Sequence, residues 1–90
     1  MGEIFNFEEK SVIVTGGARG IGRAIVNAFA KAGADVVIAD LRCEAAKTAA
    51  MNTIETFHRR AIAVKTDVAK HEDVERLRDE ALKQFGKIDV

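Results

Sequence analysis

The segment with the clearest chemical potential is rich in glycine and reads Thr15-Gly-Gly-Ala-Arg-Gly-Ile-Gly22. Glycine adopts positive φ angles easily and carries no Cβ, so its backbone can approach a diphosphate closely. A helix that begins here would direct unpaired N–H groups and its positive dipole end toward the anion. Gly16 would form the tight turn, Gly20 would let the backbone approach a pyrophosphate, and Gly22 would allow close packing of helix on strand. The segment therefore predicts a site for the diphosphate of a nucleotide.

An acidic residue stands where such a nucleotide site needs one. Asp40 ends the second apolar run of the chain, about 20 residues after Gly20, the spacing at which dinucleotide-binding folds place a carboxylate. That carboxylate accepts hydrogen bonds from the adenosine ribose and repels a 2′-phosphate, so it favours NAD over NADP. Arg19 and Arg42 stand near enough in the sequence to reach a 2′-phosphate, and NADP therefore remains a possible cofactor.

The glycine spacing separates this segment from other phosphate-binding motifs. The pattern G-x-x-x-G-x-G differs from the G-x-G-x-x-G of many dehydrogenases. Gly17 to Gly22 has the glycine spacing of a P-loop, but Arg23-Ala24 stands where that motif needs Lys followed by Ser or Thr. A P-loop is therefore rejected, and a glycine-rich turn without a ligand is the remaining alternative.

Short β-branched runs alternate with longer helical stripes along the chain. The pattern predicts strands at 11–15, 35–40 and 61–64, helices at 20–31 and 42–57, and a third helical stripe from Val74 to Phe85. Residues 88–90 look like the opening of a fourth strand. Such alternation predicts right-handed crossovers and a parallel sheet with helices on both faces. We therefore expect an α/β fold of the Rossmann type, a doubly wound parallel sheet truncated after three βα units.

Length and composition limit the domain count and the partners. Ninety residues make one domain at most, so we interpret 1–90 as the N-terminal part of a dinucleotide-binding domain without a second domain. The 14 basic residues balance the 14 acidic ones, which argues against nucleic acid or a membrane as a partner. The lone Cys43 excludes an internal disulfide and a multi-thiolate zinc site, and we predict no metal. The first ten residues lack secretory features, so we expect a cytoplasmic protein.

The sequence resembles the short-chain dehydrogenase/reductase family. The resemblance rests on Thr15 to Gly22, Ala39-Asp40, Thr66-Asp67-Val68 and Gly86-Lys-Ile-Asp-Val90, and it covers the chain from about Phe7 onward. It implies an oxidoreductase that transfers hydride between a nicotinamide cofactor and an alcohol or carbonyl substrate. In the family the residue matching Asp67 hydrogen-bonds near the adenine, although Asp67 also suits a turn. The implied cofactor-binding positions are Gly16, Arg19, Gly20, Ile21, Gly22, Asp40, Leu41, Asp67 and Val68.

The resemblance places the family's catalytic Ser, Tyr and Lys beyond residue 90. The chain contains no tyrosine, and its only serine, Ser11, begins the first predicted strand. We therefore assign no catalytic residue, expect the chain to be inactive alone, and expect an alcohol or ketone substrate only in a full-length form. Two alternatives remain: a non-catalytic nucleotide-binding module, and an interaction fragment that pairs through an open strand edge at Val12-Ile13-Val14. The same edge predicts self-association.

Overall fold

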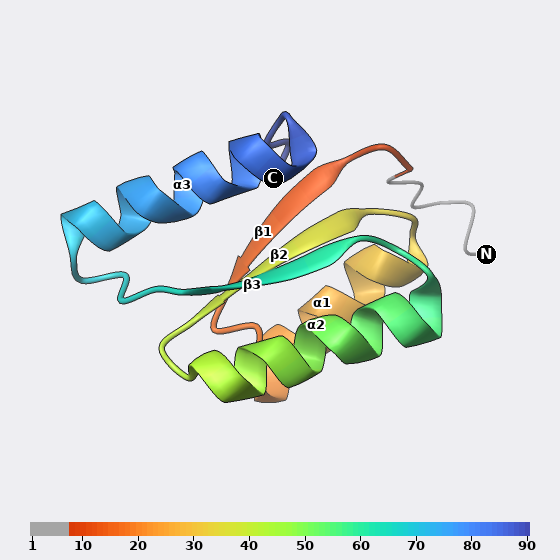
Figure 1. Ribbon diagram of the computed structural model, residues 1–90. Coiled ribbons are helices and arrows are strands. Elements are labelled where there is room, and N and C mark those ends of the chain that lie inside the picture. The colour runs from red at the N-terminus through yellow and green to blue at the C-terminus, as the bar shows by residue number, and fades with distance from the viewer. Residues whose placement is uncertain (1–7) are drawn as a thin grey trace.

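Strands and helices alternate in the computed structural model, which describes residues 8–90. The strands are β1 (Ser11–Thr15), β2 (Asp35–Asp40) and β3 (Ala61–Lys65), and the helices are α1 (Gly20–Lys31), α2 (Cys43–Phe57) and α3 (His71–Phe85). Figure 1 shows α1 and α2 on one face of the sheet and α3 on the other. The predicted α/β architecture is confirmed. Residues 1–7 lie outside the described residues. They include most of the first ten residues, for which the sequence predicts no secretory signal.

The three strands are parallel and stand in the order β1-β2-β3. The register pairs Ser11 with Asp35 and Thr15 with Ala39, and on the other side of β2 it pairs Val36 with Ala61. Because the strands run in the same direction, their carboxyl ends meet at one edge of the sheet, as the arrows in Figure 1 show. Open α/β sheets bind ligands in the crevice outside that edge.

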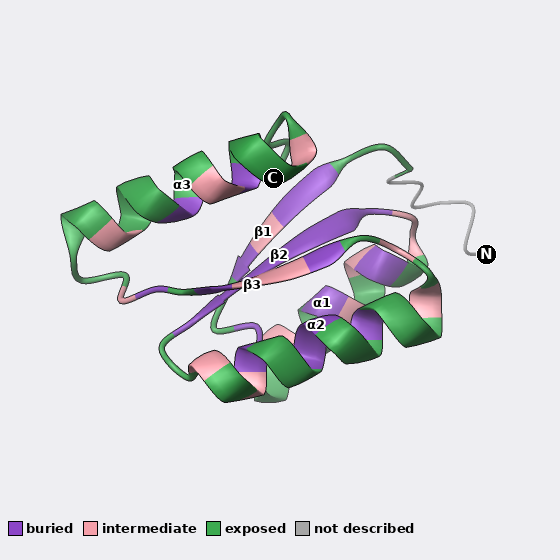
Figure 2. Ribbon diagram, viewed as in Figure 1, coloured by how far each residue is buried: buried purple, intermediate pink, exposed green. Residues whose placement is uncertain are grey.

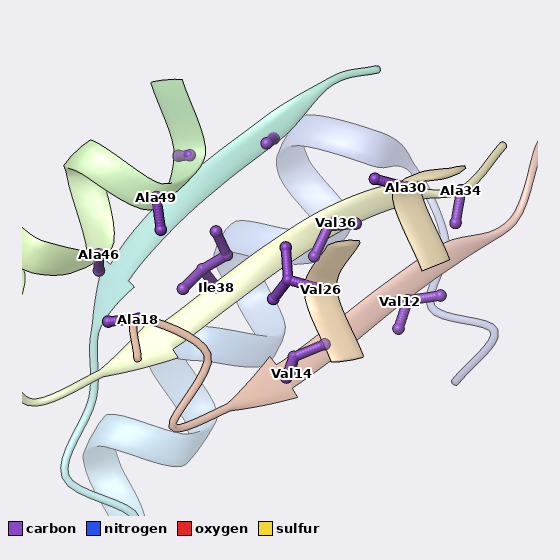
Figure 3. Packing of buried hydrophobic residues seen from close by; sticks show 12 residues of the cluster. Val12, Val14, Ala18, Val26, Ala30, Ala34, Val36, Ile38, Ala46 and Ala49 are labelled. Carbon is purple, nitrogen blue, oxygen red and sulfur yellow. The ribbon is translucent and has the colours of Figure 1, made fainter. Parts of the chain in front are cut away.

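The central strand β2 forms the middle of the core. All six of its residues are buried, and its arrow is purple in Figure 2. A strand covered on both faces carries a continuous apolar run, which explains the sequence Val-Val-Ile-Ala between its two aspartates. Val36 and Ile38 belong to the cluster beneath α1 and α2 drawn in Figure 3, whereas Val37 and Ala39 pack with residues of α3. The two terminal aspartates are thereby fixed at opposite ends of a rigid element.

The closing residues of the chain pair with β1 without forming a regular strand. Val90 donates its amide to the Ser11 carbonyl and accepts the Ile13 amide, both at 3.2 Å. This is the bonding pattern of one rung of a parallel ladder, so the fourth strand predicted at 88–90 is present only as that rung. The Asp89 carboxylate also accepts the Ser11 amide at 2.8 Å. The expectation of an unpaired edge at Val12-Ile13-Val14 is therefore wrong at the Ile13 amide, and the neighbouring Ser11 is also paired with the closing residues.

Candidate functional site

A cavity of about 430 Å³ opens at the carboxyl ends of the three strands. Five of the predicted cofactor-binding residues line it, namely Gly16, Asp40, Leu41, Asp67 and Val68. Its wall also includes Thr15, Ala39, Arg42 and Thr66. The other predicted residues lie in the loop after β1 and the first turn of α1: Arg19, Gly20, Ile21 and Gly22. The topology thus brings residues from the ends of all three strands to one cavity.

The loop between β1 and α1 requires glycine for two different reasons. Gly16 and Gly20 have φ angles of +67° and +63°, and a Cβ on either would meet nothing within 4 Å. These two positions combine a left-handed backbone with open space, which the approach of a diphosphate requires. At Gly22, by contrast, a Cβ would overlap the carbonyl group of Gly16. Gly22 therefore allows the first turn of α1 to pack on the loop. The sequence predicted that this close contact would be with the strand, whereas the nearest atoms belong to the loop backbone.

No side chain caps the backbone donors in the first turn of α1. Arg19 occupies the N-cap position with an extended backbone, its side chain makes no capping hydrogen bond, and the turn contains no acidic residue. The unpaired N–H groups and the positive end of the helix dipole are therefore available to an anion. Ile21, in the same turn, is 82% exposed and accessible to a ligand.

Asp40 is held at the end of β2 by backbone donors. Its buried carboxylate accepts the Ala18 amide on Oδ2 at 3.2 Å and the Arg42 amide on Oδ1 at 3.0 Å. The exposed guanidinium of Arg42 lies 3.9 Å from Oδ1. A carboxylate oxygen can accept two hydrogen bonds, so each oxygen of Asp40 retains acceptor capacity for a ligand. The bond from Ala18 also joins the glycine loop directly to β2.

Asp67 stabilises the loop that follows β3. Its Oδ1 accepts the Ala69 amide at 2.9 Å, and its own amide donates to the Asp73 carboxylate at 2.9 Å. The turn role that the sequence left open is therefore present, and contact with an adenine stays a prediction. Leu41 and Val68 lie beside the same cavity and are 59% and 65% exposed. Exposed apolar side chains beside a cavity are typical of ligand-binding sites.

Two residues shape the site although the sequence analysis gave them no role. Gly17 is buried under α1, where a Cβ would lie 3.0 Å from Val26 Cγ2 and 3.1 Å from Ile38 Cγ2. The doubled glycine at this point of the sequence was an available signal for it. Ala18 acts through its backbone N–H, the donor to Asp40. Every residue except proline carries that donor, so no residue type could have indicated the role of Ala18.

Residues 8–90 contain neither a helix that could span a membrane nor a cluster of metal-ligating side chains. No helix in this range is both long and apolar enough to cross a membrane. No group of three His, Cys, Asp or Glu side chains in this range could hold a metal ion.

The strand order and the position of the cavity define an α/β unit of the Rossmann type. In a comparison with family models, the model described as short chain dehydrogenase matches residues 10–90. The chain belongs to the short-chain dehydrogenase family.

Individual relatives are named as an oxidoreductase, a dehydrogenase and a reductase. An uncharacterized oxidoreductase of Mycobacterium tuberculosis is 41% identical over 88 residues, which cover 98% of this chain and 33% of that protein. The 3beta-hydroxysteroid dehydrogenase 2 of Eggerthella lenta is 38% identical over 81 residues, 90% of this chain and 31% of that protein. The structure of L-sorbose reductase from Gluconobacter frateurii, complexed with NADPH and L-sorbose, matches with a TM-score of 0.91 and 33% identity, covering 94% of this chain and 32% of that chain. The chain spans about a third of the length of these relatives.

Proposed function

We propose that this chain holds the adenosine and diphosphate half of NAD for an oxidoreductase that transfers hydride between the nicotinamide and an alcohol or carbonyl substrate. The observation that carries the proposal is the position of Asp40. Its buried carboxylate lines the cavity and is hydrogen-bonded to the glycine loop through the Ala18 amide. A ribose at Asp40 and a diphosphate at the loop would occupy adjacent places, as they do within one nucleotide.

The described residues fit this group. The first turn of α1 offers backbone donors to the diphosphate, and Gly16 and Gly20 leave open space beside the backbone. Asp40 offers acceptors to the ribose hydroxyls, and Leu41 and Val68 offer apolar surface to the adenine. The nicotinamide, when bound, supplies the hydride chemistry, which no amino-acid side chain provides.

The preference for NAD over NADP follows from charge. A 2′-phosphate bound at the ribose would stand beside the Asp40 carboxylate, which is buried and therefore poorly screened by water and salt. Arg42 opposes this effect because its guanidinium lies 3.9 Å from the same carboxylate. The relative from Gluconobacter frateurii is complexed with NADPH. The proposal is therefore a preference for NAD and not an absolute exclusion of NADP.

No residue within 1–90 is proposed to take part in proton transfer. The substrate contacts and the proton-transfer groups are assigned to a full-length form with the length of the relatives. A cytoplasmic location and self-association also stay predictions. Self-association would use the part of the β1 edge beyond Ile13, because the closing residues already pair with Ser11 and the Ile13 amide.

Calorimetric titration of the 90-residue chain with ADP-ribose, NAD and NADP tests the proposal. We expect ADP-ribose to bind, NAD to bind more tightly than NADP, and Asp40→Asn to weaken ADP-ribose binding by about tenfold, as the loss of a charged hydrogen-bond acceptor implies. The matched control is Asp79→Asn, because Asp79 is an exposed aspartate on α3. Failure of the wild-type chain to bind ADP-ribose, or equal binding by the two variants, would overturn the assignment of the site. Tighter binding of NADP would overturn only the preference.

A further inference from the structure

A second cavity, of about 470 Å³, lies at the opposite end of the sheet from the nucleotide site. It is formed where the end of α2, the start of β3 and the end of α3 converge. In Figure 1 these three segments lie on the side away from the arrowheads. The six residues of β2 separate the two ends by about 16 Å at the usual rise per residue of a strand. The two cavities are therefore independent sites.

The lining of this second cavity combines an apolar floor with a basic rim. Ile54, Ile62 and Phe85 supply the apolar surface, and Ile54 is 46% exposed. His58, Arg59, Arg60 and Gln84 supply the polar groups, and none of the described lining residues carries a carboxylate. Ligand pockets typically have this composition, a mainly apolar wall with a few convergent polar groups that fix orientation.

A buried aspartate, Asp35, accepts hydrogen bonds from both arginines and so orients them. Asp35 accepts Arg60 Nε at 3.0 Å, Arg60 Nη2 at 2.7 Å and Arg59 Nη2 at 3.5 Å. One carboxylate balances only one of two guanidinium groups, so the cluster retains a net positive charge. The guanidinium carbon of Arg60 also lies 4.8 Å from the centre of the Phe85 ring. The cation is therefore held next to an aromatic surface in a fixed geometry.

We propose that this cavity binds a small aromatic anion, with a flat apolar body against Ile54 and Ile62 and a carboxylate directed toward Arg59 and Arg60. The match of charge decides the class of ligand. A cation would meet only positive or neutral groups, and a purely apolar molecule would leave the basic rim without a new partner. The site is distinct from the nucleotide site in position and in charge, so it does not depend on the function proposed above.

Naphthalene-2-carboxylate is a suitable probe, with binding followed through the backbone amide signals of the chain in solution. We expect saturable shifts centred on Ala61, Ile62 and Phe85. The neutral isostere 2-naphthalenemethanol should bind about tenfold more weakly, because it retains the flat body and lacks the charge. Equal binding of the neutral compound, or shifts centred on Thr15 and Asp67, would overturn the proposal.

Two matched variants locate the site by charge. Ile54→Glu places a carboxylate in the cavity, whereas Met51→Glu places one on the same helix at an apolar residue that is 63% exposed and does not line the cavity. We expect a loss of about tenfold for the first and no change for the second. Gln84→Glu is isosteric at an exposed rim position and should weaken binding severalfold without affecting the fold. Unchanged affinity in Ile54→Glu or Gln84→Glu would contradict the proposed site.

Discussion

The two ends of β2 carry the same residue in two different roles. Asp35 and Asp40 are 4% and 7% exposed, and each is paired in register with a residue of a neighbouring strand. Asp35 is bound by the side chains of Arg59 and Arg60 as well as by the Arg60 amide at 3.2 Å. Asp40 is bound by two backbone amides, with one guanidinium at 3.9 Å. The first carboxylate closes an ion cluster, and the second retains acceptors at a cavity.

The difference shows that burial alone does not separate a carboxylate that closes an ion cluster from one that keeps acceptors at a cavity. Both groups sit at the end of an apolar run, and both would be costly to bury without partners. The type of partner separates them. Charged side chains at Asp35 join the starts of β2 and β3, whereas backbone donors at Asp40 fix its position without neutralising its charge. A ligand can therefore use the charge of Asp40, and the fold uses the charge of Asp35.

The largest expected effect concerns the stability of the ion cluster. We expect Asp35→Asn to lower the free energy of unfolding by about 3 kcal/mol, at the lower end for a broken buried ion pair because Arg60 is partly exposed and can be hydrated. Asp40→Asn should cost about 1 kcal/mol, because the amide oxygen of Asn can still accept one backbone bond. Urea denaturation of both variants measures the difference. A larger loss in Asp40→Asn would reverse the roles assigned to the two residues.

Packing in the glycine loop gives the next effect. Gly22→Ala should lower stability by about 2 kcal/mol and ADP-ribose affinity by about tenfold, because the new Cβ forces the loop away from α1. Gly86→Ala is the control, since Gly86 has a φ of +81°, open surroundings and a place at the end of α3. That change should cost about 1 kcal/mol and leave binding unaffected. Equal affinities in calorimetry would show that the loop geometry does not matter for the ligand.

A smaller effect is expected from the cation next to Asp40. Arg42→Ala should change stability by less than about 0.5 kcal/mol, because the Arg42 side chain is exposed and its ion pair is long. It should weaken NADP binding by about threefold more than NAD binding, since a 2′-phosphate loses its nearby positive charge. Arg78→Ala, on the exposed face of α3, serves as the control. An unchanged NAD to NADP ratio would show that Arg42 does not face the ribose.

The smallest effect concerns the contact between β1 and the closing residues. The Ser11 amide, followed by the charges of Lys87 and Lys10, holds the pKa of Asp89 below its ordinary value of 3.8. A lowered pKa in the folded state means that the stabilising contribution is complete above pH 3.8 and is lost as the pH falls through the folded-state value. The protection of the Ser11 amide against exchange, relative to the unfolded chain at the same pH, should therefore fall as the pH drops through the folded-state pKa of Asp89. In Asp89→Asn this acid-dependent step should disappear, and its persistence would assign the effect to another group.

Much of the fold was predictable because its signals are local. The apolar spacing from Gly20 to Lys31 and the run from Asp35 to Asp40 matched the observed α1 and β2. The start of α3 was harder to predict from the sequence. The helix begins at His71, one turn before its first apolar residue Val74, because acidic residues fill its first turn and Asp73 bonds the preceding loop. Such a start depends on polar contacts that hydrophobic periodicity does not report.

The candidate site was predictable in part. Glycine, Asp40 and Asp67 are residue types with a chemical signature, and the parallel topology places them at one edge. The bond from Ala18 to Asp40 had no signature, because it uses a backbone donor. The second cavity was also not predictable, because it depends on three-dimensional convergence of segments around Arg60 and Phe85. In the sequence Arg59 and Arg60 are only two adjacent basic residues, and their pairing with Asp35 becomes visible only in the structure.

An amide-resolved titration of the wild-type chain with ADP-ribose tests most directly which end of β2 serves the nucleotide. We expect saturable shifts at Gly16, Ala18 and Asp40, the region of the glycine loop and its carboxylate. The signals of Asp35 and Arg60 at the opposite end should stay unchanged. Shifts centred on Asp35 and Arg60, with an unperturbed glycine loop, would contradict the assignment of the nucleotide to the carboxyl edge of the sheet.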